Sequence, residues 1–357
     1  MGGTSIEWTD VTWNPVRGCS RVSEGCRNCY AERQAARFAE PGQPFHGFAK
    51  VTAPRDVLDR VGGRRNGWTG RVELIPSKLA EPLHWKRPRR VFVNSMSDLF
   101  HEALPDEAIA AVFGVMTACP EHTFQVLTKR PKRMRRWFEW ATDSEEGIGI
   151  DRIIYAAAHE LGDGSEADED RQVEMLRERA DAVANEVRWP LPNVWLGVSV
   201  EDQETFDARI LPLVSAPAAL RFVSYEPALG PLDCSLPVGP NATPLLRPRD
   251  PKNGPGCVHW LIVGGESGPG ARPCDVAWVR SAVQQCKAAG VPAFVKQLGA
   301  RPFDFSEVDR FAKVERIPGM IDPRFVLLRD RKGGDPSEWP EDIRVQELPA
   351  QAFGGER

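Results

Sequence analysis

The sequence has no long apolar segment. Within its 357 residues, no apolar run approaches the roughly 20 residues that a membrane-spanning helix requires. The first residues also lack the apolar core of a secretory signal. We therefore expect a cytoplasmic protein with no membrane partner. Its length allows a substantial core, built as one large α/β domain or as two smaller ones.

A strong net charge is also missing. The 46 Lys and Arg residues nearly balance the 50 Asp and Glu residues, which leaves a net charge of −4. Such a charge gives no general attraction to nucleic acid, so a nucleic-acid partner would need a local patch. One basic stretch runs from Lys129 to Arg136, and phosphate binding there would depend on salt. A solvated helix face balanced by nearby acidic residues explains the stretch equally well.

Cysteine is scarce and unevenly distributed. Three of the eight cysteines, Cys19, Cys26 and Cys29, lie within eleven residues with the spacing Cys-x6-Cys-x2-Cys. Disulfides are rare in the cytoplasm, so clustered cysteines indicate metal binding or catalysis. Gly18 and Gly25 each precede a cysteine, where the backbone has to bend. The other five cysteines are scattered, and we expect them to be structural.

No second Cys-x2-Cys pair accompanies this motif. Structural zinc usually takes four protein ligands, and downstream only His46 lies near enough in the sequence to supply a fourth. An iron–sulfur cluster on three thiolates is the alternative that we favour, because thiolates select such clusters and one iron would stay open. Zinc and three plain core cysteines remain open as the other two interpretations.

Short apolar runs of strand type alternate with helical stretches along most of the chain. The helical stretches include Pro105 to Cys119 and Val276 to Ala289. This alternation predicts a parallel sheet buried on both faces. With a first strand before the cysteines, about seven strands result, which favours a partial or full (β/α) barrel over a Rossmann sheet. The six later runs lie at residues 90–93, 123–127, 194–198, 220–223, 260–263 and 293–295.

Each predicted strand ends in polar residues, and the cysteine motif follows the first strand. In parallel α/β folds the loops after the strands share one face, which carries the site. Loops are polar in any fold, however, so a single polar strand end proves little. The residues that we expect near this face, besides the cysteines, are Asp98, Lys129, Glu201, Glu226, Glu266 and Lys296.

Two segments depart from the alternation. Residues 138–190 contain acidic stretches and an amphipathic helical stretch, and predict a helical hairpin inserted into a barrel of residues 1–299. The insertion is either a lid or partner surface or a solvated elaboration. Residues 300–357 form an irregular C-terminal extension, in which Trp339 and Pro340 are expected to pack back onto the barrel.

Several motifs resemble one known family. They are the stretch Trp8–Pro15, the glycine–cysteine pairs at residues 18–19 and 25–26, and Gly264–Gly268, Lys296–Gly299 and Lys332–Asp335. They resemble a bacterial and phage-associated three-Cys-motif family of unknown function, whose members include phage tail-gene-like proteins. The resemblance covers most of the chain outside residues 138–190. The family is regarded as radical SAM-like.

This resemblance implies a 4Fe–4S cluster on Cys19, Cys26 and Cys29, with S-adenosyl-L-methionine on the open iron. It implies a radical SAM-like barrel in which an electron donor such as flavodoxin or ferredoxin reduces the cluster. Cleavage of S-adenosylmethionine would then give methionine and a 5′-deoxyadenosyl radical that attacks an unknown substrate, for which nucleic acid is one candidate. The expected cofactor contacts are Tyr30, Ser95, Ser97, Asp98, Ser199 and Glu201.

Four strand-end residues are the candidate catalytic residues, and we expect them to hold the substrate. Glu226 and Glu266 are suited to hydroxyl groups, whereas Lys129 and Lys296 are suited to a carboxylate or a phosphate. The alternative function is a zinc-stabilised nucleic-acid-binding or phage structural protein without radical chemistry.

Overall fold

A computed structural model describes most of the chain, and contacts divide it into two compact units. The first unit holds Met1–Gly197 with Ala216–Ala219, and the second holds Val198–Ser215 with Leu220–Arg357. Each unit is described by itself below. The described residues are 4–51, 66–142, 149–181, 189–234, 237–238, 243–248, 257–304, 326 and 328–350.

The first unit is built on a parallel sheet. β1 (Val11–Trp13) pairs in parallel with β6 (Arg90–Val93), and β6 pairs in parallel with β7 (Thr123–Thr128). β8 (Val194–Val200) comes next in the strand order, and all seven of its residues are buried. Continuous apolar sequence is what a strand covered on both faces requires.

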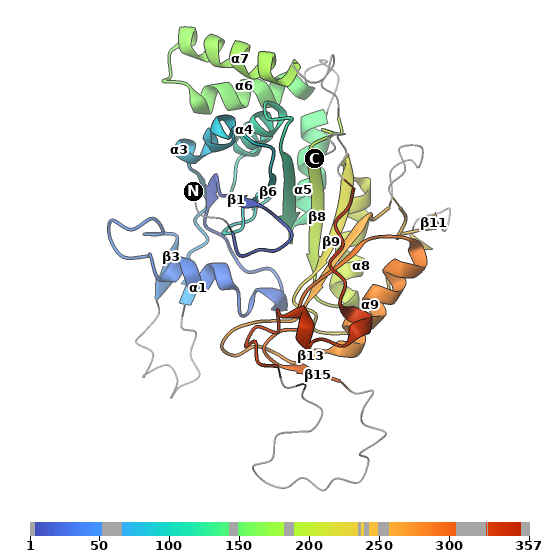
Figure 1. The fold of residues 1–357 in the computed structure, drawn as a ribbon. Coiled ribbons are helices and arrows are strands. Elements are labelled where there is room, and N and C mark those ends of the chain that lie inside the picture. The colour runs from blue at the N-terminus through green and yellow to red at the C-terminus, as the bar shows by residue number, and fades with distance from the viewer. Residues whose placement is uncertain are drawn as a thin grey trace, which may run out of the picture. The chain divides into compact units, whose positions relative to one another are not determined.

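Helices cover this sheet within the first unit. α4 (Asp106–Thr117) is buried at every position from Ala108 onward, as a helix enclosed on all sides should be. α6 approaches α4 so closely that a Cβ at Gly114 would lie 2.1 Å from the carbonyl oxygen of Ile153. α7 packs on the other side of α6, so the two form a helical hairpin over α4 (Figure 1). The remaining bounds here are α5 (Pro131–Thr142), α6 (Gly149–Leu161) and α7 (Glu166–Asp181).

Short elements complete the first unit around the cysteine motif. β1 ends before Asn14 and Pro15, so β2 (Val16–Arg17) turns away and pairs with β5 in antiparallel fashion. β3 and β4 form a second antiparallel pair. The bounds are α1 (Tyr30–Ala36), β3 (Ala49–Val51), β4 (Asn66–Trp68), β5 (Glu73–Leu74) and α3 (Pro76–Leu79).

The second unit continues the parallel arrangement. β12 (Trp260–Gly264) pairs in parallel with both β9 (Leu220–Tyr225) and β14 (Ala293–Gln297). The helices are α8 (Gln203–Ser215) and α9 (Val276–Ala289). α9 begins where the side chain of Asp275 accepts a hydrogen bond from the backbone of Ala277, and ends at Gly290 with φ 65°. A side-chain N-cap and a left-handed glycine are the signals expected at the two ends of a helix.

The C-terminal segment packs along β14. The backbone amide of Val295 donates to Val345, and that of Glu347 donates to Ala293, each at 2.8 Å. Trp339 of this segment is buried, and its indole nitrogen donates to the carbonyl of Gly333 at 2.9 Å. The remaining short strands are β10 (Pro237–Val238) with β11 (Thr243–Pro244), and β13 (Cys274–Asp275) with β15 (Pro302–Phe303).

The strand prediction is confirmed at the level of the mixed α/β fold. β8 carries residues of both units, and the seven strands follow the order β1-β6-β7-β8-β9-β12-β14. This order, with helices in the crossovers, is compatible with a partial (β/α) barrel. Within the described part of the chain, no helix is long and apolar enough to cross a membrane.

Candidate functional site

The cysteine loop, residues 18–29, begins directly after β2. Gly18 has φ 90°, and a Cβ at this position would lie 1.9 Å from the carbonyl oxygen of Arg71. Only glycine fits such an approach without movement of the backbone. Gly18 also forms an isolated bridge with Ser97, which follows β6. The bend expected before the first cysteine is therefore present, and it sets the loop against the end of the neighbouring strand.

The other two motif cysteines lie at the ends of helical segments. Cys26 ends a short 3-10 helix (Glu24–Cys26), and Cys29 immediately precedes α1. The backbone amide of Cys29 donates to the carbonyl of Cys26 at 3.4 Å. None of the eight cysteines forms a disulfide, and only Cys19, Cys26 and Cys29 are half-buried while the other five are buried. Partial exposure separates the motif thiols from those of the core.

A partly buried ion pair ties Arg21 of the loop to α1. Nε of Arg21 donates to both carboxylate oxygens of Glu32 at 3.1 Å, and Nη2 contacts the same carboxylate. Glu32 also accepts a hydrogen bond from the backbone of Trp68 at 3.0 Å, and its side chain is only 3% exposed. A bidentate arginine–carboxylate pair fixes direction as well as distance. This part of the loop is therefore held on the helix that follows it.

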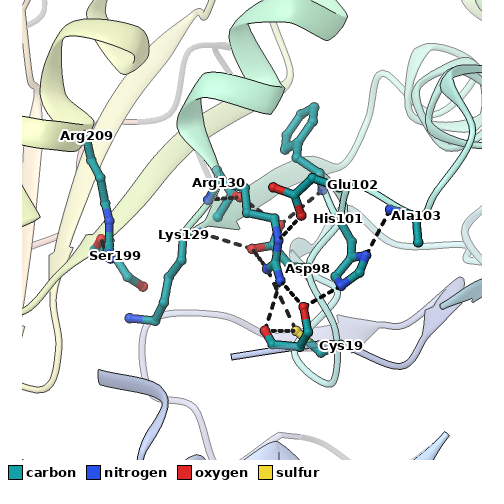
Figure 2. Close-up of polar contacts among 12 residues, drawn as sticks. Cys19, Asp98, His101, Glu102, Ala103, Lys129, Arg130, Ser199 and Arg209 are labelled. Atoms are coloured by element: carbon teal, nitrogen blue, oxygen red, sulfur yellow. Dashed lines mark hydrogen bonds and ion pairs between the residues drawn. The ribbon is translucent and has the colours of Figure 1, made fainter. Parts of the chain in front are cut away.

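A second arginine ties the start of the loop to the sheet. Arg130, which follows β7, donates from Nη2 to both the carbonyl and the hydroxyl oxygen of Ser20 at 2.9 Å. Its Nη1 donates to Asp98 at 3.0 Å, as Figure 2 shows. Cys19 therefore lies between Gly18 and Ser20, and both of these residues are held at the ends of strands.

Asp98, predicted to bind cofactor, is saturated by donors of the protein itself. Its Oδ1 accepts from the hydroxyl of Thr128 at 2.7 Å and from the amide of Phe100 at 3.1 Å. Its Oδ2 accepts from the amide of Lys129 at 3.1 Å and from Arg130. Four donors around one carboxylate hold the ends of β6 and β7 together. In this state the carboxylate acts as an anchor for Arg130.

The ring of His101 positions Ser20 without activating it. Nδ1 of His101 accepts a hydrogen bond from the backbone amide of Ala103 at 3.1 Å. The proton of the neutral ring is therefore on Nε2, which donates to the hydroxyl of Ser20 at 2.8 Å. Burial, and then the charge of Arg130, lower the pKa of His101 and favour this neutral form. A Ser–His nucleophile pair needs Nε2 as acceptor, so the opposite arrangement here is structural.

The thiols of Cys19 and Cys29 both have a raised pKa. Burial, and then the charge of Asp98, raise the pKa of Cys19 to about 12, although Arg130 opposes the rise. Burial also raises the pKa of Cys29, against backbone amides at the start of α1 that lower it. Both groups are therefore thiols near neutral pH in the metal-free protein. Binding of a metal group there would release protons.

The donor chemistry of the motif fits a soft metal group. The three cysteines lie in one loop, and the backbone hydrogen bond from Cys29 to Cys26 keeps two of them within one turn of each other. Among the residues that the structure describes, no group of three or more His, Cys, Asp or Glu side chains is arranged to hold a metal ion as it stands. The fit rests on three thiols in one loop, which is the donor set that iron–sulfur groups and zinc prefer.

The residues after β6 connect the loop to its surroundings. The hydroxyl of Tyr30 donates to the carbonyl of Ser95 at 2.6 Å, although the tyrosine is 53% exposed. The hydroxyls of Ser95 and Ser97 donate to Asn14 and Val16, at 3.1 and 2.9 Å. Three predicted cofactor contacts thus lie beside the cysteine loop and form hydrogen bonds within the first unit.

In the second unit, residues after β8 form a buried ion pair. Nη1 of Arg209 donates to both oxygens of Glu201, at 3.1 and 3.3 Å, and to the carbonyl of Ser199 at 2.6 Å. The side chains of Arg209 and Glu201 are 9% and 1% exposed. Ser199 and Glu201, both predicted cofactor contacts, are thus brought together around one guanidinium.

The predicted substrate-binding residues of the second unit include an ion pair across three strands. Glu226 follows β9, and its carboxylate lies 3.0 Å from Nζ of Lys296 on β14. β12 runs between these strands, and a Cβ on its Gly264 would lie 2.9 Å from Oε1 of Glu226. The absent side chain leaves the space in which the pair forms.

Glu266, after β12, has a bidentate partner. Its carboxylate accepts hydrogen bonds from the backbone amide, Nε and Nη2 of Arg272, at distances between 2.8 and 3.1 Å. The acidic residues that follow β6, β8, β9 and β12 are therefore each paired with a cation of their own unit. Two of these cations, Arg209 and Arg272, were not singled out from the sequence, whereas Arg130 belongs to the basic stretch that was considered for phosphate binding.

The basic stretch after β7 is partly neutralised. Arg130 pairs with Asp98 and with Glu102. Arg133 lies 2.7 Å from the carboxylate of Asp106, and Arg135 lies 2.8 Å from that of Glu139. Three of the cations expected to attract phosphate thus have carboxylate partners in the first unit.

A comparison with protein families identifies the chain at the level of the family. A family model described as "Protein of unknown function (DUF5131)" matches residues 3–321. The chain belongs to the DUF5131 family. The match includes the cysteine loop and every strand of the seven-stranded sheet. Searches of curated proteins and of solved structures give no match.

Proposed function

We propose that this DUF5131 protein is a radical S-adenosylmethionine-type iron–sulfur enzyme. In this proposal Cys19, Cys26 and Cys29 hold a 4Fe–4S cluster that leaves one iron open. The observation that carries it is the cysteine loop, with three half-buried thiols after the first strand of a parallel sheet. When bound, such a cluster supplies the electron that cleaves S-adenosylmethionine to a 5′-deoxyadenosyl radical, for use on an unknown substrate.

The number of available ligands favours the cluster over zinc. A structural zinc site takes four protein ligands, so three thiolates leave one position to fill. The nearby His101 has both ring nitrogens bonded, to Ser20 and to Ala103. The nearby carboxylate of Glu32 is bonded to Arg21 and Trp68. Within the described part of the chain, His101 and Glu32 are thus engaged in internal hydrogen bonds, which favours a cluster with an open iron over a zinc site with four protein ligands.

In this proposal the residues of the chain bind the cluster and hold the cysteine loop in place. The three cysteines supply the sulfur ligands, and the ion pair of Arg21 with Glu32 keeps the loop on α1. The segment Asn94–Asp98 lies beside the loop, so we assign the cofactor contact of the first unit to it. Burial keeps solvent from Asp98, which stays available to orient Arg130.

The substrate groups are assigned to the second unit. The side chains of Glu226 and Lys296 are 15% and 25% exposed to solvent. A ligand can therefore compete for either partner of the ion pair. In this assignment Glu226 accepts from a substrate hydroxyl, and Lys296 donates to a carboxylate or a phosphate. Glu266 keeps the corresponding role as a hydroxyl partner in this unit, whereas Lys129 keeps its role as an anion partner within the first unit. Each assignment requires an internal contact to be exchanged for the ligand.

The test compares two cysteine variants after anaerobic purification. Cys26→Ala removes one proposed ligand and should lose the bound iron while the circular dichroism spectrum stays that of the wild type. Cys286→Ala removes a buried thiol in α9 and should keep its iron. Unchanged iron in Cys26→Ala would contradict the proposal. Stoichiometric zinc in the wild type would instead support the zinc-stabilised alternative.

A further inference from the structure

The guanidinium of Arg130 directs every one of its donors at a defined acceptor. Nε donates to Glu102 at 2.7 Å, and the two hydrogens of Nη2 go to the two oxygen atoms of Ser20. Nη1 donates one hydrogen to Asp98 at 3.0 Å and has Sγ of Cys19 as its second acceptor, at 3.9 Å. An arginine has five N–H donors, so the fifth one points at the sulfur of Cys19.

This arrangement holds a positive charge beside the first cysteine. The side chain of Arg130 is only 3% exposed, and that of Asp98 is 8% exposed. Burial opposes the charge, but Asp98, Cys19 and Glu102 raise the pKa of Arg130 above its ordinary value. The guanidinium therefore stays charged while water is largely kept from it. A charge in such surroundings acts on its neighbours more strongly than one in solvent.

Two arginines hold the loop at two different places in the first unit. Arg130 fixes Ser20, at the start of the loop, whereas Arg21 is bonded to Glu32 of α1. Loss of Arg130 should therefore release residues 19–23 from the sheet while Cys29 keeps its place at the start of α1. The contribution of Arg130 can be separated from that of the rest of the loop.

We propose that Arg130 is a positioning residue for Cys19, and that its charge makes a metal group on this sulfur easier to reduce. The electronic part rests on the proposed function, since it needs a redox-active group on the three cysteines. Reduction adds one electron and hence one negative charge to that group. A fixed positive charge and an N–H donor at the sulfur stabilise the reduced form more than the oxidised form.

The main test is a reduction potential. Arg130→Gln removes the charge, Arg130→Lys keeps it without the planar fork, and Arg135→Gln removes an exposed charge of α5 as the matched control. Each reconstituted protein is titrated with reductant, and the reduced cluster is quantified by electron paramagnetic resonance. We expect Arg130→Gln to disfavour the reduced form at least tenfold, which is 59 mV for one electron. Arg130→Lys should shift in the same direction by about threefold.

A potential in Arg130→Gln equal to or above that of the wild type would overturn the electronic part. A purely structural role would leave the potential of the loaded group unchanged, so this readout separates the two. If the glutamine variant does not fold, Arg130→Met, which keeps an unbranched side chain without the charge, takes its place. An unchanged potential in that variant would then overturn the electronic part.

A second measurement uses the metal-free protein. Hydrogen–deuterium exchange of the amides at residues 19–23 should be at least tenfold faster in Arg130→Gln, while the amides of α1 keep the wild-type rate. Equal exchange at residues 19–23 in both proteins would overturn the positioning role. If the wild type takes up no iron, the proposed function fails, and the exchange rates still decide whether Arg130 positions the loop.

Discussion

Replacement of Asp98 by Asn should destabilise the first unit far more than loss of an exposed carboxylate. Asp98 accepts two hydrogen bonds on each oxygen, and an asparagine amide can accept on one side only. Its NH2 group would face the donors of Lys129 and Arg130 or those of Thr128 and Phe100. Either orientation leaves a buried guanidinium without its buried counter-charge.

The magnitude follows from the burial of the pair. Breaking a buried ion pair by removing one partner costs about 3–5 kcal/mol. Arg130 would keep Glu102 at 2.7 Å, but that carboxylate is 59% exposed and compensates only in part. We therefore expect a loss of about 3 kcal/mol from the free energy of unfolding. For a unit of this size, such a loss lowers Tm by roughly 6–12 °C.

The assay is urea unfolding followed by circular dichroism, with Asp151→Asn as the control. Asp151 pairs with Arg177 at 2.7 Å, and both side chains are about half exposed. Exposed pairs of this kind contribute roughly 0–1 kcal/mol. If Asp98→Asn were no more destabilising than Asp151→Asn, the view of Asp98 as a buried anchor would be refuted.

Two further predictions concern pH and backbone packing. Burial lowers the pKa of His122, so its neutral ring stabilises the fold above the unfolded-state pKa of about 6.5, and this stability is lost as the pH falls through the lower folded-state pKa. The Tm values of the wild type and of His122→Gln should therefore converge as the pH is lowered from about 7.5 to about 5. A difference in Tm that stays constant over this range would contradict the prediction. Gly265→Ala should lower Tm more than Gly264→Ala. A Cβ at Gly265 would lie 2.2 Å from the backbone oxygen of Leu298, whereas one at Gly264 meets a movable carboxylate at 2.9 Å. Equal Tm values for the two variants would count against the packing argument.

The strands were predictable because burial on both faces leaves a direct mark on the sequence. The runs at residues 90–93 and 260–263 appear as β6 and β12, and the helical stretch from Val276 appears as α9 with its predicted end at Ala289. The turn at Asn14 and Pro15 was harder to place, because β2 owes its direction to pairing with β5. That pairing joins residues more than fifty positions apart in the sequence.

The contacts of the candidate site were less predictable for a related reason. Polar strand ends located Asp98 and Glu226, but nothing in the local pattern named their partners. Arg130 reaches Ser20 across 110 residues of sequence, and Lys296 reaches Glu226 across two strand pairings. Side-chain ion pairs over such separations depend on the folded sheet. The sequence therefore locates the carboxylates and cysteines but leaves their pairing undetermined.

One experiment tests the central claim most directly. The protein is purified without oxygen, its iron, sulfide and zinc are measured, and it is incubated with dithionite and S-adenosylmethionine. We predict a brown protein with about four irons per chain, as one cubane requires, and formation of 5′-deoxyadenosine. A colourless protein with stoichiometric zinc and no 5′-deoxyadenosine would contradict the claim and make the cysteine loop a structural zinc site.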